Sequence, residues 1–343
     1  MELVGISEVA ELAGVTRQAV VNWRGRYVNF PQPLADLRSG PVWKRDEIIA
    51  WLKQKDGKMT KIISFINLKG GVGKTTSTVA IAEFLADEHR KNVLVVDLDP
   101  QTNATVALIS EEEWQRRDDA GQTLKQLFKD KLEKTNVFNV NDAIVRNVSN
   151  LHGGIPRLAL LPSSLGLIEL QDQLALIPGG NFYAISPVDV LAGALRPVLD
   201  GFDYVLIDCP PNLGIITLNG IGMSNGYVIP VVPDILSTYG VPQILNRIET
   251  FASTKGISVP SKGIIVSKYR VQSVLHNSRL SQMQQAAARN ELPPVFPTVI
   301  PEAAKIAEAV DFEARVNTLR QKYGYGNNYE RYSELTKDFV RLC

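Results

Sequence analysis

The stretch KIISFINLKGGVGKTT, residues 61–76, joins an apolar run to a glycine-rich turn and to the start of a helix-compatible segment. Residues 62–67 are typical of a buried strand, and Gly70, Gly71 and Gly73 follow shortly after it. Glycines let backbone N–H groups point inward and bind phosphate oxygens, and the next helix adds its positive N-terminal end. The Lys74 ammonium can reach the β- and γ-phosphates, and the Thr75 hydroxyl suits Mg²⁺. The stretch therefore predicts a phosphate loop between a strand and a helix.

Further apolar runs alternate with segments of helical pattern along the rest of the chain. We expect strands at 62–67, 93–97, 158–161, 204–208, 226–232 and 262–267. We expect helices at about 75–89, 164–175, 187–199, 214–223, 240–254, 277–290 and 329–342. This alternation predicts an α/β fold with a mostly parallel sheet and helices on both faces. Residues 110–150 are the least regular, and we interpret them as an excursion between strands with one helix around 123–132.

The composition is that of an ordinary globular protein. The chain has 343 residues, of which 45% are hydrophobic and 21% charged, and its net charge is +1. This length suggests roughly two domains. The polar stretch KQKDGKMTK, residues 53–61, marks the clearest boundary. We therefore expect a first domain at residues 1–54, a linker at 55–61 and a second domain at 62–343.

Several protein classes are disfavoured by composition. Cys209 and Cys343 cannot form a disulfide framework, and three scattered histidines argue against a zinc site. No apolar run reaches the roughly 18–20 residues that a membrane-spanning helix needs. The N-terminus MELVGISEVAELAG lacks the basic start and apolar stretch of a secretory signal. We expect a cytoplasmic protein.

The glycine-rich loop departs from the usual phosphate-loop spacing. GxxxxGK requires a glycine at position 68, where this chain has Leu68, and Lys69 adds a second lysine. KGGVGKTT resembles the deviant Walker A loop of the ParA/MinD superfamily, which includes the nitrogenase iron protein. The resemblance implies that Lys69 crosses a dimer interface to the partner's phosphates, so that Lys69 and Lys74 both serve catalysis. The expected nucleotide contacts of this loop are Lys69, Gly70, Gly71, Val72, Gly73, Lys74, Thr75 and Thr76.

Two carboxylate motifs follow expected strands. DLDPQTN begins at Asp97, and YVLIDCPPNLG contains Asp208 after four apolar residues. Ligands of open α/β sheets bind at the carboxyl ends of strands, so both motifs fall at the edge of the phosphate loop. We assign Asp208, with Thr75, to Mg²⁺. The resemblance to ParA implies that Asp99 activates the attacking water and that Asp97 supports the metal, although the division of roles between the two stays open.

The resemblance extends to three further segments around the expected nucleotide. CPPNLG resembles the second switch segment, which implies that Pro210 and Asn212 lie near the γ-phosphate. In the family, the equivalents of Ser267, Lys268 and Pro301 flank the adenine. MinD-like relatives have an asparagine where Ser267 stands, which leaves base selection open. Cys209 is expected to be a buried residue and not a nucleophile.

The N-terminal stretch ISEVAELAGVTRQAVVNWRGR, residues 6–26, reads as helix, turn and helix. Ser7 and Thr16 suit helix caps. The residues after it, 30–52, resemble the wing and last helix of MerR- or excisionase-like modules, which implies a small winged helix-turn-helix domain. The expected core comprises Val9, Leu12, Ala13, Val15, Val20, Val21, Trp23, Trp43 and Trp51. The expected DNA contacts are Arg17, Gln18, Asn22, Arg24 and Arg26. A helical module that contacts protein is the alternative.

A second candidate DNA surface lies between Thr250 and Asn290, where six basic residues and no acidic residue occur. The resemblance to ParA implies a patch that binds DNA without sequence preference in the ATP state, and counterion release would supply its affinity. We expect Lys268, Arg270 and Arg279 to carry it. A solvated or salt-bridged face is the alternative. The C-terminal YGNNYERYSELTKDFVRLC resembles a packing helix more than a basic membrane anchor, which disfavours a MinD-like membrane protein.

Together these motifs resemble a ParA-type partition ATPase over nearly the whole chain. The resemblance implies an ATP- and Mg²⁺-dependent homodimer that binds DNA non-specifically and is released when a ParB-like adaptor stimulates hydrolysis to ADP. The cargo would be a plasmid, a chromosome or, for an orphan positioning ATPase, a protein assembly. An operator-binding autorepressor with a nucleotide-sensing dimerisation domain is the alternative. The expected location is the nucleoid.

Overall fold

The computed structural model describes residues 2–13, 15–26, 30–37, 40–56, 60–176, 186–303, 312, 316–325 and 327–343. The chain divides into two compact units, Met1–Met59 and Thr60–Cys343. Each unit has its own buried apolar core. The break lies inside the expected linker, although the last helix of the first unit continues to Asp56 and the first strand of the second begins at Lys61.

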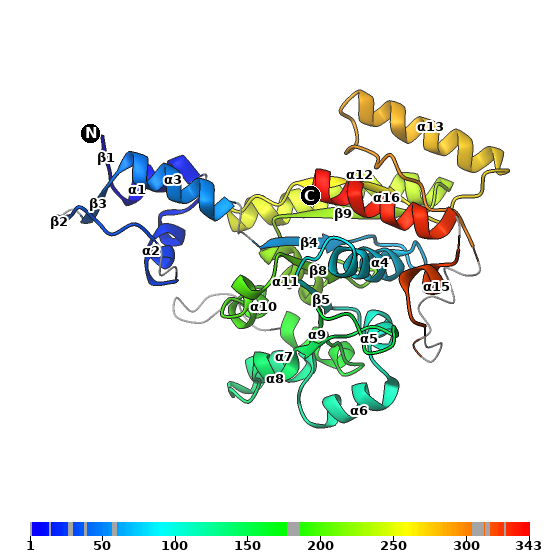
Figure 1. The fold of residues 1–343 in the computed structure, drawn as a ribbon, viewed down its shortest axis with the longest axis horizontal. Coiled ribbons are helices and arrows are strands. Elements are labelled where there is room, and N and C mark those ends of the chain that lie inside the picture. Colours follow the sequence, from blue (N-terminus) through cyan, green and yellow to red (C-terminus); the bar gives the residue numbers. More distant parts are fainter. Residues whose placement is uncertain are drawn as a thin grey trace. The chain divides into compact units, whose positions relative to one another are not determined.

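The first unit combines three helices with a small antiparallel sheet (Figure 1). Strand β3 lies in the centre, between β1 and β2. Helices α1 and α2 precede the β2–β3 hairpin, and α3 follows it. The elements are β1 (Leu3–Val4), α1 (Ile6–Ala13), α2 (Arg17–Arg26), β2 (Ala35–Leu37), β3 (Gly40–Lys44) and α3 (Arg45–Asp56).

Aromatic rings fill the core of this unit. Trp23, Trp43 and Trp51 are buried, as expected, and the ring of Phe30 contacts that of Trp51 at a centroid distance of 4.7 Å. The Trp43 indole N–H donates to the carbonyl of Pro31 at 2.8 Å, which satisfies its only polar atom. These large rings leave less room than the sequence suggested, and the expectation that Leu12 and Val21 are buried is wrong: they are 37% and 44% exposed.

Of the two helix caps expected in this unit, Thr16 is confirmed and Ser7 is not. The Thr16 hydroxyl accepts a hydrogen bond from the N–H of Ala19 at 3.3 Å and caps α2. Ser7 lies inside the first turn of α1, where the Glu8 carboxylate accepts the N–H of Gly5 at 3.0 Å. The Glu8 side chain therefore replaces Ser7 as the cap of α1.

The second unit contains one seven-stranded sheet covered by helices. Its strands are β4 (Lys61–Phe65), β5 (Val93–Asp97), β6 (Val145–Arg146), β7 (Leu158–Leu161), β8 (Tyr204–Asp208), β9 (Gly226–Val231) and β10 (Ser261–Val266). Its longer helices are α4 (Lys74–Asp87), α6 (Glu111–Asp119), α7 (Leu124–Glu133), α9 (Leu167–Ala175), α11 (Ile215–Met223), α12 (Ile235–Lys255), α13 (Val274–Ala288) and α16 (Asn327–Leu342). Its shorter helices are α5 (Asn103–Leu108), α8 (Val140–Ala143), α10 (Val190–Leu195) and α15 (Leu319–Tyr323).

The strand order is β10-β9-β4-β8-β5-β7-β6, and all pairs are parallel except β6 with β7. The six expected strands and the mostly parallel sheet are confirmed. Because β4, β5 and β8 are neighbours in this order, their carboxyl ends meet at one edge. The phosphate loop and both aspartate motifs therefore emerge at the same place.

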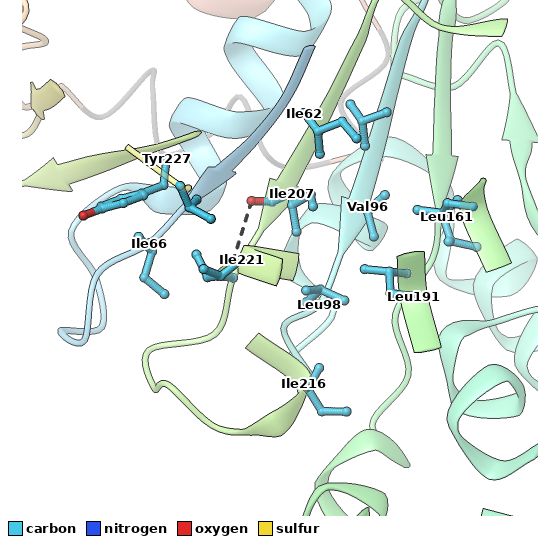
Figure 2. Close-up of a cluster of buried hydrophobic side chains, with 14 of the residues drawn as sticks. Ile62, Ile66, Val96, Leu98, Leu161, Leu191, Ile207, Ile216, Ile221 and Tyr227 are labelled. Atoms are coloured by element: carbon cyan, nitrogen blue, oxygen red, sulfur yellow. Dashed lines mark hydrogen bonds between the residues drawn. The ribbon is translucent and has the colours of Figure 1, made fainter. Parts of the chain in front are cut away.

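Side chains alternate between two apolar layers along the central strands. Ile62, Val96 and Ile207 belong to the layer shown in Figure 2, which α9, α10, α11 and α12 cover. Ile63 and Val95 belong to the opposite layer, which α4 and α16 cover. Burial on both faces explains why these strands are continuous apolar runs.

Residues 110–150 are more regular than expected. The helix predicted at 123–132 is confirmed as α7, but α6, α8 and the edge strand β6 were not predicted. Helix α6 buries none of its residues. The Ser110 hydroxyl accepts the N–H of Glu113 at 3.2 Å, and Arg116 and Arg117 pair with the Glu113 carboxylate. A local cap and ion pairs thus stabilise α6. Because these groups are polar, the sequence of α6 shows no apolar periodicity from which a helix could be predicted.

One expected helix is shorter in the structure, since α10 covers only part of 187–199. Among the described residues, no helix is long and apolar enough to span a membrane.

Candidate functional site

A cavity of about 300 Å³ opens where β4, β5 and β8 end. The phosphate loop, the first turn of α4 and the segment after β5 form most of its wall. Its lining residues are Gly70, Gly71, Gly73, Lys74, Thr75, Thr76, Asp99, Gln101, Asn103, Val106, Pro211 and Lys268. The structure thus brings most of the expected phosphate-loop residues around one space.

The loop adopts a conformation that needs glycine at two positions. Gly71 and Gly73 have φ angles of 73° and 80°, in the left-handed region. A Cβ atom on Gly73 would also lie 3.1 Å from the Ser267 hydroxyl oxygen. That hydroxyl donates to the carbonyl of Val72 at 2.7 Å. The residue after β10 therefore supports the loop from behind.

Lys74 begins α4 and lines the cavity. Its ammonium donates to the carbonyl of Lys69 at 3.2 Å and so closes the loop across its mouth. Burial lowers the pKa of Lys74, while the charges of Asp208 and Asp99 act in the opposite direction. A phosphate placed in the loop would add further negative charge beside this ammonium.

Thr75 lines the cavity and contacts Asp208, which does not itself line it. The Thr75 hydroxyl donates to one Asp208 carboxylate oxygen at 2.6 Å, and Thr78 approaches the other at 3.4 Å. Burial raises the pKa of Asp208 to about 7, although the Thr75 hydrogen bond and Lys74 lower it in part. Cys209, the next residue, is fully buried as expected, and burial raises the pKa of its thiol.

Asp97 and Asp99 have different surroundings. Asp97 faces Asp208 across β5 and β8, and its carboxylate accepts hydrogen bonds from the N–H of Asp99 at 3.1 Å and from the N–H and hydroxyl of Thr105 at 2.8 and 2.7 Å. Burial and the neighbouring Asp208 raise the pKa of Asp97. Asp99 lines the cavity, and Ser163 holds its backbone carbonyl at 2.8 Å. Asp97 therefore orders the turn that presents Asp99.

Lys69 does not line the cavity. Its ammonium forms an ion pair with Asp234, just before α12, and its N–H donates to the Asn67 side chain at 2.9 Å. The side chain is 38% exposed. In this single chain, Lys69 is thus held by a carboxylate of its own subunit.

Besides Lys69, five expected nucleotide contacts do not line the cavity: Val72, Pro210, Asn212, Ser267 and Pro301. Their positions have structural reasons. The Asn212 side chain accepts the N–H of Gly214 at 2.8 Å before α11, and Pro301 pairs with Tyr269 in a short parallel bridge. Pro211 lines the cavity in place of its neighbour Pro210.

Besides Pro211, three lining residues were missed by sequence reasoning: Gln101, Asn103 and Val106. They belong to the turn after β5 and to α5, a helix that was not predicted. Their place in the DLDPQTN motif, directly after Asp99, was the available signal. When the chain passes from the end of a strand directly into a helix, the first turn of that helix lies at the same edge of the sheet.

The oxygen donors of Thr75 and Asp208 suit Mg²⁺. Magnesium favours carboxylate and hydroxyl oxygens and keeps several waters, with phosphate oxygens completing its shell. Thr75 and Asp208 supply one donor of each kind. Within the described ranges, no group of three or more His, Cys, Asp or Glu residues could hold a metal ion without such help. The donor set therefore fits a metal that arrives with a nucleotide.

The expected DNA contacts of the first unit differ in their availability. Arg17 and Gln18 are exposed at the start of α2. The Arg24 guanidinium lies 5.4 Å from the centre of the Trp43 ring and 3.9 Å from the Asp36 carboxylate. The side chains of Asn22 and Arg26 lie outside the described part of the structure. Arg24 is therefore partly engaged by its own unit.

The basic stretch at 250–290 is partly neutralised by neighbours just outside it. Arg270 forms an ion pair with Glu302. Arg289 pairs with Glu291 at 2.7 Å. Arg279 donates to Gln282 at 2.8 Å, pairs with no carboxylate among the residues that the structure describes, and is partly exposed on α13. The salt-bridged alternative thus applies to part of this surface.

The match to a known protein family lies within the second unit. Residues 60–259 match the family model AAA_31, described as an AAA domain. The chromosome-partitioning ATPase Soj of Thermus thermophilus is 31% identical over 251 residues, which cover 73% of this chain and 84% of the relative. The apo structure of McdA from Cyanothece has a TM-score of 0.62 and 22% identity, covering 82% of this chain and 99% of that one. Cobyrinic acid a,c-diamide synthase from Mycobacterium smegmatis, with bound ADP and magnesium, has a TM-score of 0.60 and 26% identity, covering 82% and 95%.

Proposed function

Because the chain belongs to the AAA_31 family of AAA domains, we propose that it is a ParA-like ATPase that uses ATP and Mg²⁺ to switch between DNA-bound and free states. The contact of Thr75 with Asp208 carries this proposal, since it joins two of the three expected metal-site residues next to the phosphate loop, and Thr75 lines the cavity. Relatives named as partitioning ATPases support the same class. A solved relative with bound ADP and magnesium supports the choice of cofactors.

The residues of the site have complementary roles in this proposal. The loop N–H groups and Lys74 hold the phosphates, and Thr75 and Asp208 hold the metal directly or through water. Bound Mg²⁺ supplies neutralisation of the charge that develops on the phosphates during hydrolysis. Asp99, presented by Asp97 and Ser163, orients the attacking water. The turn after Asp208, with Pro211 at the cavity, senses the γ-phosphate.

Dimerisation is the second part of the proposal. In the ATP state, two subunits close face to face, and Lys69 leaves Asp234 for the phosphates of the partner subunit. A phosphate group carries more negative charge than one carboxylate, which favours this exchange once nucleotide is bound. The dimer then aligns two copies of the surface that includes Lys268, Arg270 and Arg279. A ligand must bind the two states with different affinity to switch them, and ATP does so here.

The test is fluorescence anisotropy of a labelled, arbitrary-sequence duplex with the full chain near physiological salt. We expect binding with ATP–Mg²⁺ and much weaker binding with ADP–Mg²⁺. The variant Arg279→Glu should weaken this binding about tenfold or more, because a phosphate contact becomes a repulsion. The matched control is Arg289→Glu, since Arg289 is already paired with Glu291. Equal binding in both nucleotide states would refute the switch.

The variant Lys69→Ala tests the dimer separately. It should abolish ATP-dependent dimerisation, measured by sedimentation velocity, while ATP still binds to the single subunit. Asp234→Asn is the matched comparison and should keep Lys69 available for the partner's phosphates. An unaltered ATP-dependent dimer in Lys69→Ala would contradict the role assigned to this lysine.

A second function is favoured by the first unit, in which α1 and α2 precede a β-hairpin and a third helix. This order supports a winged helix-turn-helix that binds an operator, and Arg17 and Gln18 are exposed on α2. The protein would then repress a promoter while the second unit senses nucleotide. Tight binding to one promoter fragment with ADP, lost in Arg17→Glu, is the expected result. Fragments selected from genomic DNA without any common sequence would exclude it.

A further inference from the structure

A second hollow, with a volume of about 480 Å³, lies in the second unit between residues of α7, the segment after α7, and α10. It is larger than the nucleotide cavity and shares no lining residue with it. Its lining residues are Leu127, Asp130, Lys131, Lys134, Thr135, Asn136, Phe138, Val140, Val190, Gly193 and Ala194. Nothing in the proposed ATPase cycle uses this hollow.

The wall after α7 is held in place by one buried carboxylate. One oxygen of Asp130 accepts from the Gln126 amide and the Thr135 hydroxyl, and the other accepts from the N–H groups of Val137 and Phe138, each at 2.7 Å. These hydrogen bonds lower the pKa of Asp130, although burial acts against them. Hydrogen bonds within the chain therefore fix this loop, as in preformed binding sites.

The lining combines an apolar floor with a positive rim. Leu127 and Val190 are buried, and Phe138, Val140 and Ala194 are partly buried at the surface of the same core. Lys131 and Lys134 lie at the rim. Lys134 forms no ion pair with any residue that the structure describes, and the carboxylate of Asp130 is already engaged by four donors. The hollow thus offers apolar contacts and positive charge together.

We propose that this hollow docks an acidic segment of a partner protein that carries apolar anchor residues. Charge complementarity with Lys134 selects acidic side chains, and the floor selects an apolar anchor. The mouth continues onto exposed surface, because Val137 is 68% exposed and Gly193 presents no side chain on α10. A chain segment can use this continuation, whereas a small amphiphile would leave it uncovered.

The hollow is also connected to the nucleotide site through α11. The buried Asn219 side chain accepts the N–H of Leu191 at 3.1 Å and donates to the carbonyl of Pro187 at 2.8 Å, which ties α10 to α11. Helix α11 follows the turn that contains Pro211. Docking that shifts α10 would therefore alter ATP hydrolysis, and this consequence rests on the proposed function.

The test measures binding of a fluorescein-labelled peptide in which leucine and glutamate repeat at helical spacing. The full chain should bind it, and should bind a matched leucine–lysine peptide about tenfold or more weakly, because the rim would repel it. Lys134→Glu and the hollow-filling Gly193→Trp should each weaken binding of the acidic peptide by a similar factor. Lys129→Glu is the matched control, since Lys129 lies on α7 outside the lining and near Glu133.

Three results would overturn the proposal. They are equal binding of both peptides, unchanged binding in both Lys134→Glu and Gly193→Trp, and absence of any peptide binding. Anilinonaphthalene sulfonate, bound at the hollow while no peptide binds, would assign the site to a small amphiphile instead. Thermal unfolding of each variant separates lost binding from lost folding. The assay contains neither ATP nor DNA, so its failure is independent of a failure of the proposed ATPase cycle.

Discussion

Folding and metal binding make opposite demands on the charge of Asp208. This residue is fully buried, contacts Thr75 and faces Asp97 of β5, and burial raises its pKa to about 7. A carboxyl group in this position opposes folding when it must ionise, yet its ionised form is the one that suits a metal. The conflict is typical of residues kept for function and not for stability.

The variant Asp208→Asn should therefore be more stable than the parent in the absence of nucleotide and metal. Since the pKa of this acid is higher in the folded than in the unfolded protein, the parent loses stability as pH rises from about 4 to about 7, by up to about 1.4 kcal/mol per pH unit. The gain from the variant should grow over the same window and then level off. Thermal unfolding measured from about pH 4 to about pH 8 covers this window and its upper plateau.

ATP hydrolysis should be lost in the same variant. A gain in stability that does not change between low and neutral pH would contradict the raised pKa. Asp203→Asn, an aspartate outside the cavity that accepts the N–H of Asn92, is a suitable control.

Helix α4 joins the phosphate loop to the C-terminal segment. Glu83, in its interior, is fully buried and accepts hydrogen bonds from the Lys322 ammonium at 2.8 Å, the Tyr323 hydroxyl at 2.7 Å and the Ser149 hydroxyl at 2.6 Å. These partners come from α15 and from the loop before β7. One carboxylate thus fastens two distant segments to the helix that begins at Lys74.

Glu83→Ala should destabilise the second unit by about 3–5 kcal/mol, because it leaves the buried Lys322 ammonium without its partner. Denaturant unfolding at neutral pH measures the change. The double variant Glu83→Met with Lys322→Met is the control, since replacement of both charges by apolar side chains is often close to neutral. Equal losses in the single and double variants would show that the ion pair is not the main contribution.

Each of the two units has an apolar core that is built from residues of its own part of the chain. The nucleotide cavity and the hollow at α7 and α10 both lie in Thr60–Cys343. A chain of this second unit alone should therefore fold and hydrolyse ATP.

Deletion of residues 1–59 tests this independence. We expect ATP hydrolysis within about twofold of the full chain, because every residue that lines the nucleotide cavity belongs to the second unit. Steady-state phosphate release measures it. Operator binding, if the first unit provides it, should be lost. A deletion variant that unfolds at much lower temperature would show that the second unit depends on the first.

Local chemistry in the sequence was enough to identify the phosphate loop, the six long strands and the class of the fold. Three glycines before Lys74 and apolar runs before Asp97 and Asp208 are each readable from near neighbours. Helix α6 escaped detection because its stabilising groups are polar and local. Leu12 was misplaced because the packing of tryptophans, and not helical spacing, decides what the small core admits.

The arrangement of the site depends on contacts between residues far apart in the chain. Thr75 meets Asp208 across 133 positions, and Ser267 supports Val72 across 195. Such contacts follow from the order of strands in the sheet, which no local pattern encodes. The sequence therefore established which chemical groups the protein carries, whereas folding decided that Asp99 lines the cavity while Asp97 supports it, and that Lys69 pairs with Asp234 in its own subunit.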